Sequence, residues 1–397
     1  MKLRQSLSLA LLSFTMAGSA WADPGYQQGY KHGYKAEYRL TVVGPAGSTA
    51  TDINSAGVVV GRYGPSASSR GFLNRGSGVV TLGTLGGTSS DAVAINDKGQ
   101  VLGHWTNASG QRRGYLYDCG TQRDIGIIGG EPTGYSDINN AGYVVARTFA
   151  SVTSDRIIGY LRAPDGTLRD IGTLPVPPGD IPLTDALALN NKNQITGSSG
   201  RLELPEIPYR AFLWTRGVMR DLGDLGSQPN SGRAVNDRGQ VTGFASVPGG
   251  FPDRVAFLYS RGRLISIDER TSGMRYSEGN DINYRGHIVG SSDHLQAFIW
   301  RGRRMESLNA LVRRPEWNIV DADAINDAGQ IAATAVRNGV SYAVRLDLVR
   351  PHVDRAAPAE HDEEADVAAP VSQAQAAQRA KEEAQAVARE VAVPVGQ

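Results

Sequence analysis

The sequence predicts an all-β fold, a seven-bladed β-propeller with four-stranded blades. First, a unit consisting of an apolar residue followed by Asn-x-x-Gly occurs seven times. Second, its Asn residues run from Asn54 to Asn326 at a mean spacing close to the ~40–45 residues typical of a four-stranded blade. Third, no helical periodicity interrupts residues 38–350, whereas Gly and Pro, 48 and 19 in the chain, recur between short apolar runs.

The repeated Asn-x-x-Gly unit is expected to be a tight turn between the first and second strands of each blade. Asn at the first position bonds back to the backbone, and Gly at the fourth accepts a positive φ. Asn193, which also tolerates that conformation, replaces Gly in the fourth copy. A calcium loop is the alternative, but copies such as NSAG and NNAG lack the necessary carboxylates. The Asn positions are 54, 96, 139, 190, 236, 283 and 326.

Each repeat continues with a third and a fourth strand. The third reads GYLY at residues 114–117 and AFLW at residues 211–214, with apolar residues at adjacent positions. Both faces of such a strand are covered, as expected for a blade between two neighbours. A Gly-containing turn then leads to a fourth strand, such as RDIG at residues 123–126.

This ordered pattern resembles the HAF repeat of exported bacterial proteins. The resemblance covers about residues 38–350 and recurs in order seven times. Departures are mild: the third copy reads AGYVVA at residues 141–146, and the fourth strands at residues 264–268 and 305–308 are degenerate. The resemblance implies extracellular binding or scaffolding rather than a reaction.

The two ends of the repeat array predict a closed ring. The last copy stops at Leu348 without a fourth strand, whereas an orphan strand lies at residues 38–43. Leu40 and Val43 precede Ile53 with the spacing that fourth-strand leucines of later blades show before the next blade. We therefore expect the N-terminal strand to complete the last blade and to cover its exposed edge.

The flanking segments differ in composition from the repeats. Residues 1–22 have a positive start, an apolar run and the small-x-small site Ala20-Trp21-Ala22, a pattern typical of a signal peptide rather than a membrane anchor. We expect an exported protein, periplasmic or extracellular. Residues 23–37 are a Gly/Tyr-rich linker, and residues 351–397 an Ala/Glu-rich tail, disordered or marginally helical.

Composition and motifs favour a binding protein over an enzyme. A net charge of +1 does not favour nucleic acid, and no further run of ~18 apolar residues predicts a membrane span. There is no G-x-S-x-G, no H-E-x-x-H and no phosphate loop, and no His lies at metal-ligand spacing. We predict no catalytic residue, no metal site and no cofactor, and a monomeric protein.

The candidate ligand-binding residues lie in the connections that vary between copies. Second-to-third and fourth-to-first connections share one face, and function usually resides on variable loops over a rigid scaffold. Aromatic and Arg residues are enriched in recognition sites, although packing beneath the loops would also explain them. The candidates, for a protein or glycan partner, are Trp105, Arg113, Tyr209, Phe251 and Trp317.

Axial carboxylates support a rival interpretation. Asp residues lie at nearly equivalent places, before or at the start of the first strand of several blades, and would form one ring at a channel mouth. The simpler explanation of these Asp residues is that they are solvated loop residues or turn caps. With a catalytic ring, the protein would be a secreted glycoside hydrolase or polysaccharide lyase; a surface structural protein is a third class. The carboxylates are Asp91, Asp137, Asp185, Asp281 and Asp321 or Asp323.

Overall fold

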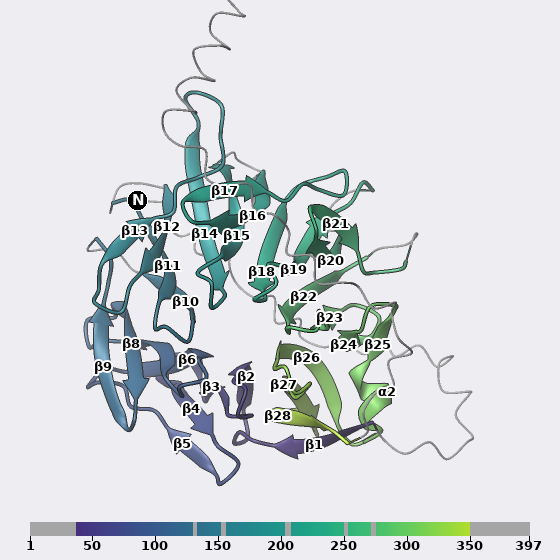
Figure 1. The fold of residues 1–397 in the computed structure, drawn as a ribbon. Coiled ribbons are helices and arrows are strands. Elements are labelled where there is room, and N and C mark those ends of the chain that lie inside the picture. Colours follow the sequence, from purple (N-terminus) through teal and green to yellow (C-terminus); the bar gives the residue numbers. More distant parts are fainter. Residues whose placement is uncertain are drawn as a thin grey trace, which may run out of the picture. The chain divides into compact units, whose positions relative to one another are not determined.

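The computed structural model describes residues 37–129, 133–151, 156–202, 208–249, 253–270 and 275–349. Within them, seven four-stranded antiparallel sheets form a ring around a central axis (Figure 1), so the predicted seven-bladed propeller is confirmed. The predicted signal peptide, almost all of the linker and the tail lie outside the described residues.

In blades 1 to 6, four consecutive strands run from the axis to the rim. Blades 1 to 3 contain β2 (Ser48–Ile53), β3 (Val59–Tyr63), β4 (Arg70–Asn74), β5 (Val79–Thr81), β6 (Ser89–Ile95), β7 (Val101–Thr106), β8 (Arg112–Asp118), β9 (Thr121–Gly126), β10 (Gly134–Ile138), β11 (Val144–Phe149), β12 (Ile157–Arg162) and β13 (Leu168–Asp170). Blades 4 to 6 contain β14 (Ile181–Leu189), β15 (Ile195–Leu202), β16 (Tyr209–Thr215), β17 (Val218–Asp221), β18 (Asn230–Val235), β19 (Val241–Ser246), β20 (Arg254–Ser260), β21 (Arg263–Ser266), β22 (Ser277–Ile282), β23 (Ile288–Ser292), β24 (Gln296–Trp300) and β25 (Met305–Ser307).

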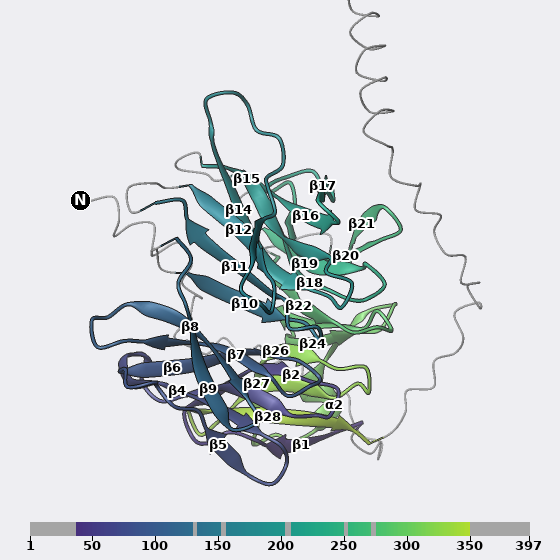
Figure 2. The same cartoon turned by 60° about the vertical axis from the view of Figure 1, so that its left-hand side comes forward.

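Blade 7 joins the two ends of the array, as predicted. It contains β26 (Asn318–Ile325), β27 (Ile331–Arg337), β28 (Val340–Leu348) and, as its outer strand, β1 (Tyr38–Val42). β1 pairs antiparallel with β28 from Tyr38 opposite Leu348 to Val42 opposite Val344. Figures 1 and 2 both show β1 beside β28. Tyr38 and Val43 are buried, and Leu40 is half-buried.

Neighbouring blades bury their apolar side chains against each other. One cluster joins Val60 and Leu73 of blade 1 to Ile95 and Tyr115 of blade 2, and comparable clusters recur around the ring. This arrangement explains why both faces of the third strands are apolar. The prediction of strands alone missed a helix of five residues, α2 (Leu308–Val312), between β25 and β26, and a short 3-10 turn over Ser66–Ser68.

Each inner strand carries an irregularity near its end. In blade 2 the register shifts between Ala92 and Ala94, leaving one extra residue on the inner strand. A Cβ on the facing Gly103 would lie 2.1 Å from the carbonyl oxygen of Asp91, so the backbones approach too closely for a side chain there. Such a bulge redirects the residues that follow it. Those residues form the channel mouth described below.

Candidate functional site

The seven Asn residues of the Asn-x-x-Gly turns form a closed ring of hydrogen bonds. The Nδ2 of each Asn donates to the backbone carbonyl oxygen of the Asn in the next blade, over 2.8–3.2 Å, and Asn326 donates back to Asn54. All seven side chains belong to buried residues. The turn geometry is as predicted, because the fourth residue has a positive φ in every copy, including Asn193 at 57°.

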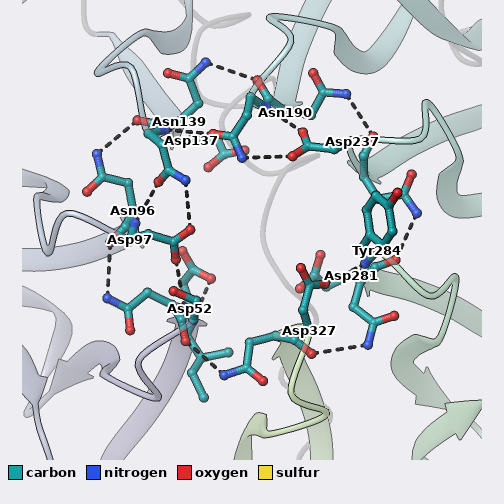
Figure 3. A pocket seen from close by; sticks show the side chains of 18 of the residues that line it. Asp52, Asn96, Asp97, Asp137, Asn139, Asn190, Asp237, Asp281, Tyr284 and Asp327 are labelled. Atoms are coloured by element: carbon teal, nitrogen blue, oxygen red, sulfur yellow. Dashed lines mark hydrogen bonds between the residues drawn. The ribbon is translucent and has the colours of Figure 1, made fainter.

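A cavity of about 220 Å³ lies at the mouth of the channel on this face. Its lining includes residues of all seven turns together with Asp52, Asp137 and Asp281, whose side chains surround the same opening (Figure 3). Tyr284, 56% exposed, is its one aromatic lining residue. The wall therefore offers amide and carboxylate groups and a single aromatic ring.

Three carboxylates at this mouth each connect two neighbouring blades. Asp52 accepts the backbone N–H groups of Ile53, in its own blade, and Ile95, in the next, both at 2.7 Å. Asp137 accepts those of Ile138 at 2.7 Å and Leu189 at 2.9 Å.

Asp281 forms the third such connection, with Ile282 at 2.7 Å and Ile325 at 2.8 Å. The three carboxylates therefore connect blade 1 to blade 2, blade 3 to blade 4, and blade 6 to blade 7. The four other blades carry Ala at the corresponding position, namely Ala94, Ala188, Ala234 and Ala324. In blades 2, 4 and 7, the residue after this Ala already donates its backbone N–H to the Asp of the preceding blade.

The three carboxyl groups that connect the blades, Asp52, Asp137 and Asp281, have raised pKa values. Their side chains are partly exposed to the cavity but surrounded by protein. Burial is the largest cause of the raised pKa in all three. It raises the pKa of Asp137 to about 7 and that of Asp281 to about 6, although backbone N–H groups act in the opposite direction. The pKa of Asp52 lies well above its usual range because of burial and the negative charge of Asp137. Asp137 and Asp281 therefore take up a proton at about pH 6–7 in the folded protein.

The prediction of a single ring of axial carboxylates was wrong, because they lie at two levels of the inner strands. Asp137 and Asp281 lie two residues before the turn Asn, at the level of the cavity. Asp91, Asp185 and Asp321 lie five residues before it, nearer the opposite mouth, and Asp323 lies between the two levels.

Asp52 was missed by the sequence-based prediction, although it belongs to the cavity level. The alternation of Asp-Ile-Asn with Ala-Ile-Asn among the copies is the signal that could have revealed it.

Carboxylates near the opposite mouth are largely paired with basic side chains. Arg233 and Arg254 both contact Glu278, Arg147 contacts Asp185, and Arg112 contacts Asp91. Asp91 also accepts from His104, 3.1 Å away, whose Nε2 accepts the backbone N–H of Tyr135. Burial lowers the pKa of His104, so this imidazole stays neutral.

Asp321 and Asp323 differ from these paired carboxylates. The Nδ2 of Asn280 donates to Asp321 at 2.8 Å, and the hydroxyl of Thr334 donates to Asp323 at 3.1 Å. Burial and the charge of Glu278 raise the pKa of Asp321 to about 6. Burial and the charge of Asp321 raise that of Asp323 well above its usual range.

The five predicted ligand-binding residues lie on three blades or outside the described residues. Trp105 and Arg113 are in strands β7 and β8 rather than in the loop between them, which is a correction. They contact each other, with the guanidinium 5.8 Å from the indole centroid, and both bond Asp124. Of the four candidates within the described residues, the structure therefore brings only these two together.

The other predicted residues are separate from that pair. Tyr209 begins β16 and is also a strand residue, which corrects the loop assignment. Trp317 precedes β26 and packs edge-on against Tyr342, at 5.4 Å between ring centroids. Phe251 lies outside the described residues.

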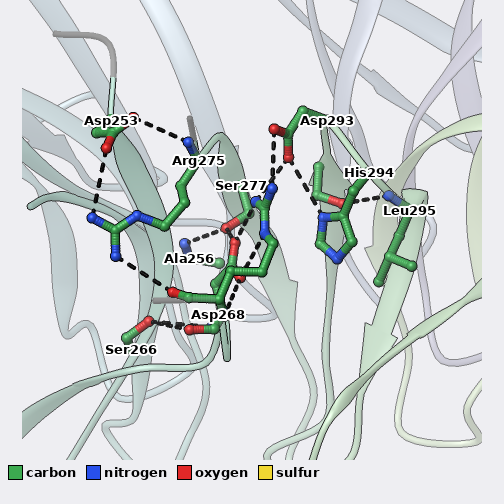
Figure 4. A network of polar contacts seen from close by, with 11 residues as sticks. Asp253, Ala256, Ser266, Asp268, Arg275, Ser277, Asp293, His294 and Leu295 are labelled. Carbon is green, nitrogen blue, oxygen red and sulfur yellow. Dashed lines mark hydrogen bonds and ion pairs between the residues drawn. The ribbon is translucent and has the colours of Figure 1, made fainter. Parts of the chain in front are cut away.

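The face opposite the Asn-x-x-Gly turns, which we call the loop face, carries a network of ion pairs over blades 5 and 6 (Figure 4). Arg270 contacts Asp268 at 2.7 Å and Asp293 at 2.8 Å, and Ser277 donates to Asp268 at 2.7 Å. Arg275 donates its backbone N–H to Asp253 at 3.0 Å. These charges hold loop segments against one another.

The described residues contain neither a cluster of metal-ligand side chains nor a membrane-spanning helix. No group of three or more His, Cys, Asp or Glu side chains in them is arranged to hold a metal ion. No helix in the same ranges is long and apolar enough to cross a membrane.

Comparisons with solved structures show that the protein is a β-propeller. The β-propeller domain of the Trilobed protease from Pyrococcus furiosus is similar at 9% identity and a TM-score of 0.50, over 77% of this chain and 99% of that one. The Pyrococcus horikoshii acylaminoacyl peptidase is similar at 11% identity and a TM-score of 0.50, over 76% of this chain and 51% of that one. No protein-family model and no curated protein matches the sequence. At these identities the similarity concerns the fold alone.

Proposed function

We propose that this propeller is a non-catalytic binding module that holds a glycan at the mouth of its central channel, on the face of the Asn-x-x-Gly turns. The observation that carries the proposal is the cavity of about 220 Å³ lined by amides, carboxylates and Tyr284. Sugar hydroxyls donate and accept hydrogen bonds, and the C–H face of a sugar ring packs against an aromatic ring, so this wall suits a sugar. Pockets for whole small molecules measure ~300–1,000 Å³, so this one would take a single sugar unit.

We also propose that the protein acts outside the cytoplasm and belongs with the HAF-repeat proteins. The signal-peptide pattern of residues 1–22 and the seven ordered repeats support both parts of this proposal. Detection of the native protein in periplasmic or culture-medium fractions, with cleavage after Ala22, would test the export.

The test of the binding site replaces Tyr284 by the residue that other blades carry. Asn occupies this turn position in blades 3 and 4, as Asn140 and Asn191, so Tyr284→Asn is compatible with the turn. The purified protein is screened on an array of neutral and acidic oligosaccharides, and the best binder is measured by calorimetry. Tyr284→Asn should weaken that binding by about tenfold or more, the equivalent of about 1.4 kcal/mol.

Ile265→Asn is the control, because this residue is 49% exposed on the outer strand β21, away from the cavity. It should bind like the wild type. Absence of glycan binding, or unchanged binding by Tyr284→Asn, would overturn the proposed site. Loss of binding only in Trp105→Ala or Trp317→Ala would favour the loop face instead.

A hydrolase or lyase is the second candidate, favoured by one observation. Asp321 and Asp323 lie two residues apart on β26 and both have raised pKa values, and a carboxyl group with a raised pKa can act as the general acid in glycoside cleavage beside a second carboxyl group. Release of reducing ends or unsaturated products from a bound polysaccharide, lost in Asp323→Asn without loss of binding, would establish this function and refute the non-catalytic one.

A further inference from the structure

A group of exposed basic side chains lies beside the cavity, on the same face. We call it the basic arc; it occupies turns of blades 4, 5 and 6. First-to-second turns contribute Lys192, Arg238 and Arg285, third-to-fourth turns contribute Arg216, Arg303 and Arg304, and Arg263 follows such a turn as the first residue of β21.

The strand order places all of these turns at one end of the blades. Successive strands of a blade are antiparallel, so the first-to-second and third-to-fourth turns emerge on the same face. Arg216 lies in the turn between Thr215 and Val218, which are paired, and Arg263 pairs with Ser260 across the next turn. Tyr284 links the arc to the cavity, because it lines the cavity and lies 5.8 Å from the Arg238 guanidinium.

The basic arc is not neutralised by carboxylates of the described residues. None of its seven side chains forms an ion pair within those ranges. The carboxylate of Asp237, in the blade 5 turn, accepts the backbone N–H and the Nδ2 of Asn191 instead. In contrast, arginines toward the opposite face are paired with acidic residues, namely Arg112, Arg113, Arg147, Arg201, Arg210, Arg254, Arg270 and Arg275.

The positive charge is confined to one side of this face. The corresponding turns of blades 2, 3 and 7 carry acidic residues, namely Asp97, Asp118, Asp165 and Asp327, and those of blade 1 carry a single basic residue, Arg75. A protein with a net charge of only +1 therefore has one strongly basic sector. Such a sector attracts and orients an anionic partner.

We propose that the basic arc binds the carboxylate groups of an acidic polysaccharide, of which one sugar occupies the cavity. This inference rests on the proposed function and names its class of ligand. Six of the seven side chains are Arg, whose planar guanidinium binds a carboxylate through two parallel hydrogen bonds.

A polysaccharide fits this surface better than a nucleic acid does. Both polymers carry one negative charge per unit, but the phosphates of a nucleic acid lie in the backbone that links the units. The carboxylate of a uronic acid instead projects from one edge of the sugar ring, and the opposite edge carries hydroxyls, which can bond Asp52, Asp137 and Asp281 in the cavity wall. Hydroxyls can therefore face the cavity while the carboxylates lie over the arc.

The experiment measures binding of polygalacturonate to the full protein at several NaCl concentrations. The variant Arg216→Glu/Arg263→Glu/Arg303→Glu reverses three charges of the arc. The control, Arg62→Glu/Arg75→Glu/Arg123→Glu, makes the same change in net charge at exposed positions of blades 1 and 2. The arc variant should bind at least about thirtyfold more weakly and with a flatter salt dependence, whereas the control should lose less than about threefold.

Three results would overturn the inference: equal losses in both triple variants, unchanged binding in the arc variant, or tighter binding of double-stranded DNA than of polygalacturonate at equal salt. Its failure can be told apart from failure of the cavity site. If neutral oligosaccharides bind through Tyr284 but polygalacturonate binds no more tightly than they do, only the acidic ligand class is wrong. If polygalacturonate binding needs the arc but not Tyr284, only the cavity assignment is wrong.

Discussion

At each turn Asn, one amide group bonds in two directions. In blade 2, the Oδ1 of Asn96 accepts the backbone N–H groups of Lys98 and Gln100, which holds the turn closed. Its Nδ2 donates to the carbonyl oxygen of Asn139 in the next blade, 3.0 Å away. An amide supplies an acceptor and a donor on two separate atoms, whereas an ionised Asp has no donor, which explains the repeated choice of Asn over Asp.

Replacing one member of this ring should destabilise the propeller. Asn96→Asp keeps the acceptor but removes the donor and places a charge beside the Asn139 carbonyl. We expect the free energy of unfolding to fall by at least about 1–3 kcal/mol, since a buried hydrogen bond is lost. Urea denaturation followed by circular dichroism measures it. The neighbouring exposed Asp97→Asn, which keeps an acceptor for Ser55, should change it by less than about 0.5 kcal/mol; equal effects would contradict the role of the ring.

How far the sequence predicts single residues depends on whether their partners are local. The turn role of Asn follows from contacts within five residues, and it was predicted correctly. The role of Asp52 depends on Ile95, which is remote in sequence and adjacent only once the blades are packed. Trp105 was assigned to a loop because it lies in a connection that varies between copies, although the pairing of β7 with β8 extends through it.

Among the elements, β1 has the largest consequence for the ring. Its strand character and its place beside β28 were predicted from the incomplete last repeat and from the spacing of Leu40 and Val43. The most buried anchor of the strand, Tyr38 at 2% exposed, was not predicted. It packs in a cluster with Leu308 and Val312 of helix α2, and a helix of five residues is too short to show a periodic pattern.

Truncating this anchor should weaken the closure of blade 7. Tyr38→Ala removes a buried aromatic side chain, and such changes cost about 3–5 kcal/mol. We expect a correspondingly lower melting temperature by calorimetry, together with association of the exposed β28 edge at high concentration. Val42→Ala on the same strand, 43% exposed, should alter stability by less than about 1 kcal/mol. If Tyr38→Ala melts like the wild type, β1 does not hold the ring closed.

For the whole molecule, the channel links stability to pH. Folding raises the pKa values of Asp52, Asp137, Asp281, Asp321 and Asp323. An unfolded Asp has a pKa near 4, so from about pH 7 down to pH 4 the folded protein binds protons that the unfolded chain does not. Stability therefore increases as pH falls through this window. His104 acts oppositely below about pH 6.5, because its folded pKa is lowered. Carboxyl groups with lowered pKa values, such as Asp91 and Asp268, act oppositely only near and below about pH 4.

We accordingly expect a higher melting temperature at about pH 5 than at about pH 8, measured by calorimetry at constant ionic strength. The variant Asp52→Ala/Asp137→Ala/Asp281→Ala should show a smaller difference between these two pH values, since Ala occupies the same position in the other four blades. A wild-type melting temperature that declines steadily from pH 8 to pH 5 would show that the channel carboxyls do not dominate the pH response.

The pairing of blades by three carboxylates also has a consequence of parity. Pairs cannot divide an odd cycle evenly, so a ring of seven must contain one unpaired member. Here it is blade 5, where Ala234 follows Ala188 and neither position provides a carboxylate. Rings of six or eight blades built from such pairs would contain no unpaired blade. Blade 5 is thus the one unit that could be lost, or added a second time, without dividing any pair between blades.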